Sequence, residues 1–196
     1  MNKVVPTDAV LIPEQATCVF EGQIFAVYQW QQELFDGSYD TFEMLKRPDT
    51  TSVICVVDDK LIVLDEEQPA SGKRRSFPGG RVDETDADII AAAQREVLEE
   101  TGYTFKHWRL VKVWQPIKKM EWFIYLVLAW GEASQGETTH DPGEKITVEY
   151  VDLAELKRLA SGKVGYLGES TDLLAGVENL SDLIATPEFQ GKTITR

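Results

Sequence analysis

The chain has 196 residues, enough for one domain with a substantial core. Hydrophobic residues make up 43% and charged residues 27%, which is typical of a folded globular protein and not of a disordered one. The formal net charge of −13 argues against a nucleic-acid duplex and against an anionic membrane surface as partners. A small phosphorylated molecule remains compatible with this charge, because a bound metal ion reverses the local sign.

The cysteine and histidine content argues against several kinds of site. Cys18 and Cys55 lie far apart in apolar, strand-like runs, so neither a disulfide framework nor a thiolate zinc site is expected. His107 and His140 are the two histidines, which gives little support to imidazole metal sites or Ser-His-Asp catalysis. Residues 1–14 lack the apolar run of a signal peptide and no stretch reaches membrane-spanning length, so we expect a cytoplasmic protein.

Residues 17–48 predict an antiparallel β meander. Three strand-like runs, ATCVF, QIFAVYQWQQEL and YDTFEMLKR, are separated by turn signals at Glu21-Gly22 and Asp36-Gly37. We expect the aromatic side chains of this meander to pack in a core or at a dimer face: Phe20, Phe25, Tyr28, Trp30 and Phe35.

The middle of the chain predicts a buried sheet. Residues 52–67 contain two apolar strands joined at Asp58-Asp59, and their unbroken apolar character indicates strands covered on both faces. Residues 104–116 and 121–131 are two further strands, of which the second is almost entirely apolar and is expected to be central.

The last third predicts a loop, one strand and helices. Residues 131–145 are polar, with no helix or strand signal of their own. Residues 146–153 form a strand that leads into a helix over 152–162, and residues 171–185 predict one amphipathic helix. Strands on both sides of one central helix, with helices appended, indicate an α/β (α+β) fold in which a mixed sheet lies between helices.

The most informative stretch is residues 79–103. Alanines at 91–93 favour a helix from about Asp88 to Glu100, and Gly102 can end it in the left-handed conformation. Three glutamates at i, i+3 and i+4 then fall within an arc of roughly 100° on one helix face: Glu96, Glu99 and Glu100.

Three carboxylates at the C-terminal end of a helix repel one another and the helix dipole. Arg95, at i, i+4 from Glu99, offsets one of them. A hard divalent cation is the remaining candidate for the others, since Mg²⁺ prefers oxygen ligands. The alternative is a solvated acidic helix end. The preceding Pro78-Gly79-Gly80 turn favours the metal, because glycines let backbone carbonyls approach the same cation.

The run REVLEETGY, from Arg95 to Tyr103, together with Gly80, resembles the Nudix box of the Nudix hydrolases. One feature departs from the box. The segment between Gly80 and Arg95 is one residue longer, and the central glutamate is replaced by Asp86 or, counted back from Arg95, by Ala87. The resemblance assigns that glutamate a structural role, so the departure concerns the loop rather than the metal site.

The resemblance implies an αβα sandwich and a metal-dependent site. It implies Mg²⁺, with Mn²⁺ as an alternative, bound by Glu96, Glu99, Glu100 and the backbone carbonyl of Gly79. It also implies that Arg95 holds the glutamates in place. In relatives that cleave ADP-ribose, an acidic residue from a loop past the box completes the site. Loop 131–145 offers Glu144 first and Asp141 second, and the alternative for either is a solvated loop acid.

Basic residues near the box are candidates for substrate contact. Lys73-Arg74-Arg75 is a dense basic cluster that ends close to Gly79, and we expect Arg74 or Arg75 to contact phosphate or ribose rather than form a solvated turn. Lys118 has the same two interpretations, and Trp114 can stack on a base or pack in the core.

The N-terminal passage over residues 37–57 is similar to the ADP-ribose and nucleoside-diphosphate-sugar pyrophosphatases, whose meander forms a dimer that shares the substrate pocket. This divides the chain into a meander (1–48), a Nudix domain (49–160) and a helical tail (161–196). SFPGG is instead closer to members that cleave nucleoside triphosphates. The usual Gln-Tyr-Arg after the second strand is also replaced, by Glu67, Gln68 and Pro69.

The sequence therefore predicts a Mg²⁺-dependent, dimeric hydrolase of a small nucleotide. The expected substrate is a nucleoside diphosphate linked to a second group, such as ADP-ribose or a nucleotide sugar, which is cleaved to two monophosphates. The alternatives are a triphosphate or dinucleoside-polyphosphate hydrolase and a non-catalytic module that senses a nucleotide.

Overall fold

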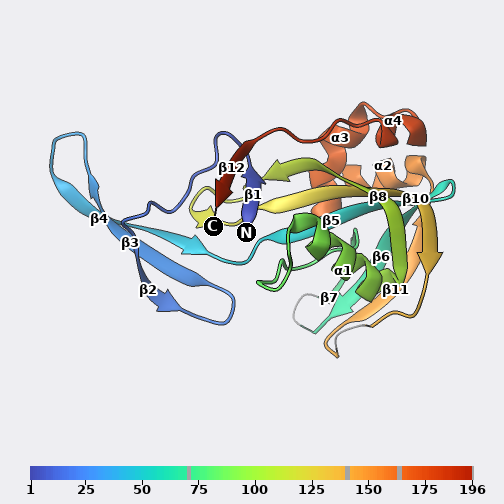
Figure 1. Ribbon diagram of the computed structural model, residues 1–196, viewed down its shortest axis with the longest axis horizontal. Coiled ribbons are helices and arrows are strands. Elements are labelled where there is room, and N and C mark those ends of the chain that lie inside the picture. Colours follow the sequence, from blue (N-terminus) through green and yellow to red (C-terminus); the bar gives the residue numbers. More distant parts are fainter. Residues whose placement is uncertain (70–71, 140–141, 163–164, 196) are drawn as a thin grey trace.

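The computed structural model describes residues 1–69, 72–139, 142–162 and 165–195. Its centre is a mixed sheet with strand order β11-β6-β5-β10-β8 (Figure 1). The strands are β5 (Thr50–Val57), β6 (Lys60–Gln68), β8 (Tyr103–Trp114), β10 (Ile124–Gln135) and β11 (Lys145–Val151). β5 and β10 pair in parallel and the other neighbours are antiparallel. The predicted mixed sheet and its buried hairpin at Asp58-Asp59 are confirmed.

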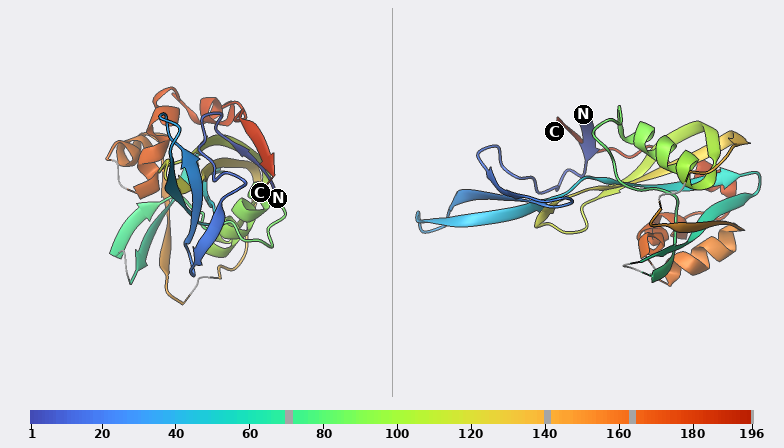
Figure 2. Two further views of the ribbon diagram at one scale, coloured as in Figure 1. Left: turned by 90° about the vertical axis from the view of Figure 1, so that its left-hand side faces the viewer. Right: turned by 90° about the horizontal axis from the view of Figure 1, so that it is seen from below.

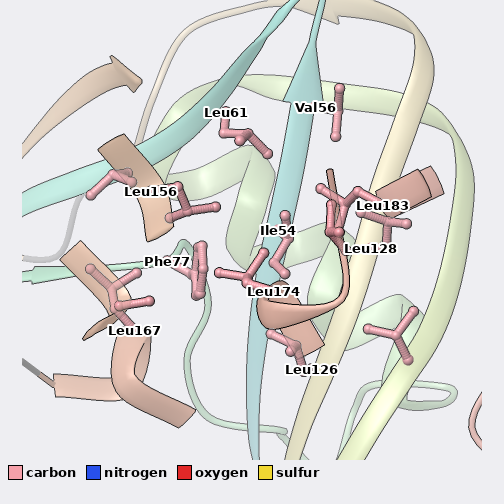
Figure 3. Close-up of a cluster of buried hydrophobic side chains, with 14 residues drawn as sticks. Ile54, Val56, Leu61, Phe77, Leu126, Leu128, Leu156, Leu167, Leu174 and Leu183 are labelled. Carbon is pink, nitrogen blue, oxygen red and sulfur yellow. The ribbon is translucent and has the colours of Figure 1, made fainter. Parts of the chain in front are cut away.

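Helices cover both faces of this sheet. α1 (Ile89–Thr101) packs on one face through Ala93 and Val97. The other face carries α2 (Leu153–Ser161), the 3₁₀ helix η1 (Gly165–Ser170), α3 (Thr171–Ala175) and α4 (Leu180–Ile184). Leucines from these helices meet Ile54, Leu126 and Leu128 of the sheet in one buried cluster (Figure 3). The αβα arrangement explains why β5 and β10 are apolar on both sides.

The predicted N-terminal meander is an arm that projects from the body (Figure 2). Its strands are β2 (Thr17–Glu21), β3 (Ala26–Glu33) and β4 (Tyr39–Lys46), with the short β9 (Met120–Glu121) beside β4. Gly37 turns the β3–β4 hairpin with a φ of 83°. Large apolar side chains of the arm are exposed, among them Phe20, Ile24 and Phe35.

The two ends of the chain lie side by side. β1 (Asn2–Val5) pairs antiparallel with β12 (Lys192–Thr195), with Asn2 opposite Thr195. Next to this pair, Lys3 Nζ lies 2.6 Å from a carboxylate oxygen of the buried Asp49. The backbone carbonyl of Asp49 accepts the amide of Val82 at 2.8 Å, so the paired ends are connected to the loop before α1.

The structure differs from the sequence prediction in several elements, among them the strands β1 and β12, which were not predicted. β10 continues to Gln135 through the first part of the predicted loop, because Gly131 (φ 93°) bends the strand and Ala133 to Gln135 still pair with β8. The predicted tail helix is two short helices, α3 and α4, since Gly176 ends the first and Asn179 forms a capping box for the second. β7 (Gly72–Ser76) was not predicted as a strand.

No helix in the described part of the chain is both long and apolar enough to cross a membrane.

Candidate functional site

The Pro78-Gly79-Gly80 loop connects β7 to the segment before α1. It runs beside β5, where Thr51 N–H donates to Gly80 O at 2.8 Å and Val53 N–H donates to Pro78 O at 2.7 Å. A Cβ atom on Gly80 would lie 2.7 Å from the carboxylate of Glu96. Glycine therefore lets this loop fit between β5 and the acidic face of α1.

Helix α1 has the limits that the sequence predicts. The Asp88 side chain caps its start by accepting the amide of Ala91 at 2.8 Å. Gly102 ends it with a φ of 73°, and its amide donates to Leu98 O at 2.9 Å. The loop after β10 packs on this end, where Gly136 N–H donates to Gly102 O at 2.8 Å. A side-chain cap thus fixes the start of α1, and backbone hydrogen bonds fix its end.

Arg95 connects the loop to the helix. Its Nε and Nη2 bind the two carboxylate oxygens of Asp86 at 3.1 and 3.0 Å, and Nη2 also donates to Arg81 O at 2.9 Å. Its Nη1 contacts Glu96 at 2.9 Å and Glu99 at 3.1 Å. The bidentate bond holds the pKa of Asp86 below its usual value. Asp86, rather than Ala87, is therefore the residue of this segment whose side chain ties the loop to Arg95.

Two of the three glutamates are held away from water. Burial is the main cause that raises the pKa of Glu96 to about 7 and that of Glu100 to about 9. Glu100 Oε2 accepts the amide of Gly79 at 2.7 Å, so the backbone of Gly79 lies beside this carboxylate. Glu99 is turned toward Arg95, with 42% of its side chain exposed.

A hard divalent cation suits these donors. Within the described residues, no three acidic, histidine or cysteine side chains come close enough together to form a metal cluster. Glu100 is nevertheless buried and Glu96 only 14% exposed, so desolvation drives both carboxylates toward the neutral form, and a cation beside them would stabilise the charged form. Carboxylate oxygens such as those of Glu96 and Glu100 are the ligands that Mg²⁺ takes.

The loop past the box lies against α1. Thr139 N–H donates to Glu99 O at 2.8 Å. Glu144 accepts a hydrogen bond from the Gln68 side chain at 2.8 Å, and its negative charge contributes to the raised pKa of Glu100. Glu144 therefore lies near enough to Glu100 for the two carboxylates to interact. The second candidate base, Asp141, lies outside the described residues.

A polar cavity of about 290 Å³ lies beside the glycine loop, and Gly79 and Gly80 form part of its lining. Arg74, a predicted substrate contact, lines it, whereas Arg75 is on the opposite face of β7 and pairs with Glu149 at 3.0 Å. Lys118 and Trp114 do not line this cavity. Lys118 pairs with Asp8 at 2.8 Å, and Trp114 packs against the hydrophobic core. The charged residues of the lining are Arg47, Glu66, Arg74 and Arg81.

Arg47 and Glu66 were not identified from the sequence. The Arg47 guanidinium lies 4.5 Å from the centroid of the Trp122 ring, and its buried Nε has no hydrogen-bond partner among the described residues. Glu66 is 6% exposed. Arg47 directly follows strand β4. Neither Arg47 nor Glu66 stands in a local sequence pattern that indicates a site, because their neighbours in space come from distant segments.

A second cavity, of about 530 Å³, adjoins the first at Arg47. It lies between the base of the arm, the N-terminal strand and the loop before α1, and Phe25, Tyr28 and Lys46 are among its lining residues. Its walls are half polar and half apolar in character, unlike those of the cavity beside the glycine loop. The two cavities together offer a polar compartment next to the glutamates and a more apolar one farther away.

Comparisons with known proteins agree with this geometry. The NUDIX domain family matches residues 46–167. A curated ADP-ribose pyrophosphatase of Bacillus subtilis (strain 168) is 29% identical over 97 residues, which are 48% of this chain and 51% of that protein. The chain thus matches only about half the length of this relative. A solved structure described as an ADP compounds hydrolase has a similar fold, with a TM-score of 0.62 at 20% identity over 79% of this chain and 85% of that one. The glycine loop and the capped acidic helix lie within the matched region, and the family match covers most of the chain. The chain therefore belongs to the NUDIX family.

Proposed function

We propose that the protein is a Mg²⁺-dependent hydrolase that cleaves a nucleoside diphosphate linked to a second group, ADP-ribose or a nucleotide sugar, into two monophosphates. The observation that carries this proposal is that one glycine loop contacts Glu96 and Glu100 and also lines an arginine-rich polar cavity. The name of the B. subtilis relative, an ADP-ribose pyrophosphatase, supports the same substrate class.

In this proposal the chain's own residues divide the work. Glu96, Glu99, Glu100 and the Gly79 carbonyl hold Mg²⁺, with Mn²⁺ as a substitute. When bound, the metal neutralises phosphate charge and lowers the pKa of a coordinated water. A carboxylate oxygen of Glu144, or of Asp141, accepts the proton of the attacking water. Arg95 keeps the glutamates oriented.

In this proposal, each cavity receives a different part of the substrate. Arg47 and Arg74 receive the diphosphate in the polar cavity, because guanidinium groups bind phosphate oxygens in pairs. The adjoining cavity of about 530 Å³ takes the nucleoside, with the aromatic rings of Phe25 and Tyr28 available for stacking. Arg47 borders both and contacts substrate at the junction.

We also propose a homodimer formed through the arm, in a reducing, cytosolic compartment. Contiguous apolar side chains on a projecting sheet are a typical protein–protein contact surface. The cysteines Cys18 and Cys55 are both free, as the reduced cytosol favours. Sedimentation in solution checks the dimer, and a strict monomer contradicts it.

A hydrolysis screen with Mg²⁺, in which the nucleotide and phosphate products are separated by chromatography, tests the function. It compares ADP-ribose, nucleotide sugars, dinucleoside polyphosphates and nucleoside triphosphates, with Glu100→Gln as the control. Preference for ADP-ribose or a nucleotide sugar supports the proposal. Preference for a triphosphate would favour the alternative that the SFPGG loop suggests, and no turnover would favour a binding module.

A further inference from the structure

The cavity beside the glycine loop contains one acidic side chain among three arginines. Glu66, on β6, lies directly opposite Arg74 of β7 in the antiparallel pairing, so both side chains emerge on the same face of the sheet. Arg74 Nε is bound to one carboxylate oxygen of Glu66, and the Ser76 hydroxyl donates to the other at 2.9 Å. Both oxygens of this buried carboxylate are therefore fixed.

Glu66 changes the charge of the cavity. Arg81 is more than half exposed and is paired with Asp83 at 2.7 Å, so the inner positive charges are those of Arg47 and Arg74. In the described part of the chain, Arg47 Nε has no hydrogen-bond partner and its guanidinium rests on the Trp122 ring, whereas the charge of Arg74 is balanced by Glu66. Among the described residues, the lining then has one arginine without an ion-pair partner and one arginine that is held in place by Glu66.

The same carboxylate lies near the proposed metal ligands. Glu66 lines the cavity together with Gly79, whose amide donates to Glu100, and Gly80, which lies against Glu96. A phosphate chain that reaches from the glutamates past the glycine loop into the cavity thus meets Glu66 as a fixed negative charge.

We propose that Glu66 is a specificity-determining residue: it orients Arg74 toward a diphosphate diester and repels the additional charge of a triphosphate. This inference rests on the proposed function, because it concerns the phosphate chain of the same substrate. A diphosphate diester carries one negative charge on each phosphate. The terminal phosphate of a triphosphate carries a second charge, which Glu66 disfavours by like-charge repulsion.

The chain provides a matched control. Arg75 is the next residue along β7 and pairs with Glu149 on the other face, where neither side chain lines the cavity. Glu149→Gln therefore removes a carboxylate from the partner of an adjacent arginine without changing the cavity. Any difference between Glu66→Gln and Glu149→Gln reports on position and not on the loss of an ion pair in general.

The first measurement is the ratio of kcat/KM for ATP to kcat/KM for ADP-ribose. This ratio is insensitive to the fraction of folded enzyme, which cancels. Glu66→Gln is expected to raise it at least about tenfold, mainly through a lower KM for ATP, and Glu149→Gln to leave it unchanged. An unchanged or lower ratio in Glu66→Gln overturns the proposal.

A second measurement does not depend on turnover. Calorimetric titration of the metal-free protein with ADP-ribose and with ATP gives the binding preference without any reaction. Glu66→Gln is expected to shift this preference toward ATP, and Arg74→Gln to weaken the binding of both ligands. If wild-type protein hydrolyses no diphosphate, the proposed function fails, while the titration still decides the role of Glu66. Equal preferences in wild type and Glu66→Gln overturn it.

Glu66→Asp covers the case in which Glu66→Gln does not fold. Aspartate keeps the charge but withdraws it from Arg74 and Ser76. The preference for ADP-ribose over ATP should persist, while the affinity for ADP-ribose falls severalfold because Arg74 is no longer held. A reversed preference in Glu66→Asp contradicts the proposal.

Discussion

The box region and the arm are built in opposite ways. Around Arg95, three hydrogen bonds to Asp86 and Arg81 O link the loop to the helix, and two more join Arg95 to Glu96 and Glu99 of the same helix. In the arm, strands β2, β3 and β4 are connected by their own ladders while Phe20 and Phe35 remain exposed. The contacts that stabilise the box come from one short segment, whereas the arm has apolar surface that no other part of the described chain covers. Substitutions in the two regions should therefore fail in different ways.

The largest effect is expected at the metal site. Glu100→Gln should lower kcat at least about 100-fold, since a metal ligand matters more than the residues that support it, which are worth about 10–100-fold. Circular dichroism should show an unchanged fold, because glutamine has the same shape and can still accept the Gly79 amide. Activity near that of wild type in Mg²⁺ would contradict a metal role for Glu100.

The next effect concerns Asp86. Asp86→Ala removes the bidentate partner of Arg95, so kcat should fall about 10–100-fold and the free energy of unfolding by about 1–3 kcal/mol. Urea unfolding and steady-state kinetics check both values. Asp83→Ala is the control, because Asp83 is more exposed and lies 3.8 Å from Arg95. Equal losses in the two variants would show that the bidentate bond has no special role.

A smaller effect appears in the pH dependence of stability. The pKa of Glu100 is about 9 in the folded chain against an ordinary value of 4.5, so the folded state retains a proton that the unfolded state releases. The free energy of unfolding of the metal-free protein should therefore fall as the pH rises between these two values. Glu100→Gln does not show this fall in stability, because glutamine does not titrate.

Thermal melts in a chelator test that difference. The Tm of Glu100→Gln should exceed that of wild type by a few degrees at pH 8 and by less at pH 5, since 1 kcal/mol shifts Tm by about 2–4 °C in a chain of this size. The same difference at both pH values would mean that the charge of Glu100 is not its cause.

The smallest effect on the monomer is expected at the tip of the arm. Phe35→Ser should change the free energy of unfolding by less than about 0.5 kcal/mol, because this side chain is fully exposed. If the arm forms the proposed dimer, the same change should weaken association in sedimentation experiments. Lys60→Ser, in the β5–β6 hairpin of the body, is the control. A Phe35 variant that loses stability without any change in association would contradict a contact role.

These differences also explain what the sequence could predict. The caps of α1 and the contacts of Arg95 depend on spacing within one segment, so they are readable from local pattern. Arg74 depends on the register between β7 and β6, which sets whether it or Arg75 faces the cavity. A shift of one residue in that register would exchange the two. Local pattern does not contain this information.

Other parts of the site depend on still longer-range contacts. Arg47 acquires its surroundings from Trp122, which lies on the far side of the box in the sequence. The strand character of residues 133–135 arises from pairing with β8, against a polar composition that favours a loop. In the tail the reverse holds, since the signals of Gly176 and Asn179 were present but the apolar periodicity suggested one continuous helix.

The pairing of β1 with β12 has a consequence for the order of folding. β12 pairs with β1 although most of the described sequence lies between the two strands. Lys3, Asp49 and Val82 connect that pair to the loop before α1. Contacts of such sequence separation form slowly, because the intervening loop must close first. We therefore expect the loop before α1 to reach its final position late in folding, after β12 has paired with β1.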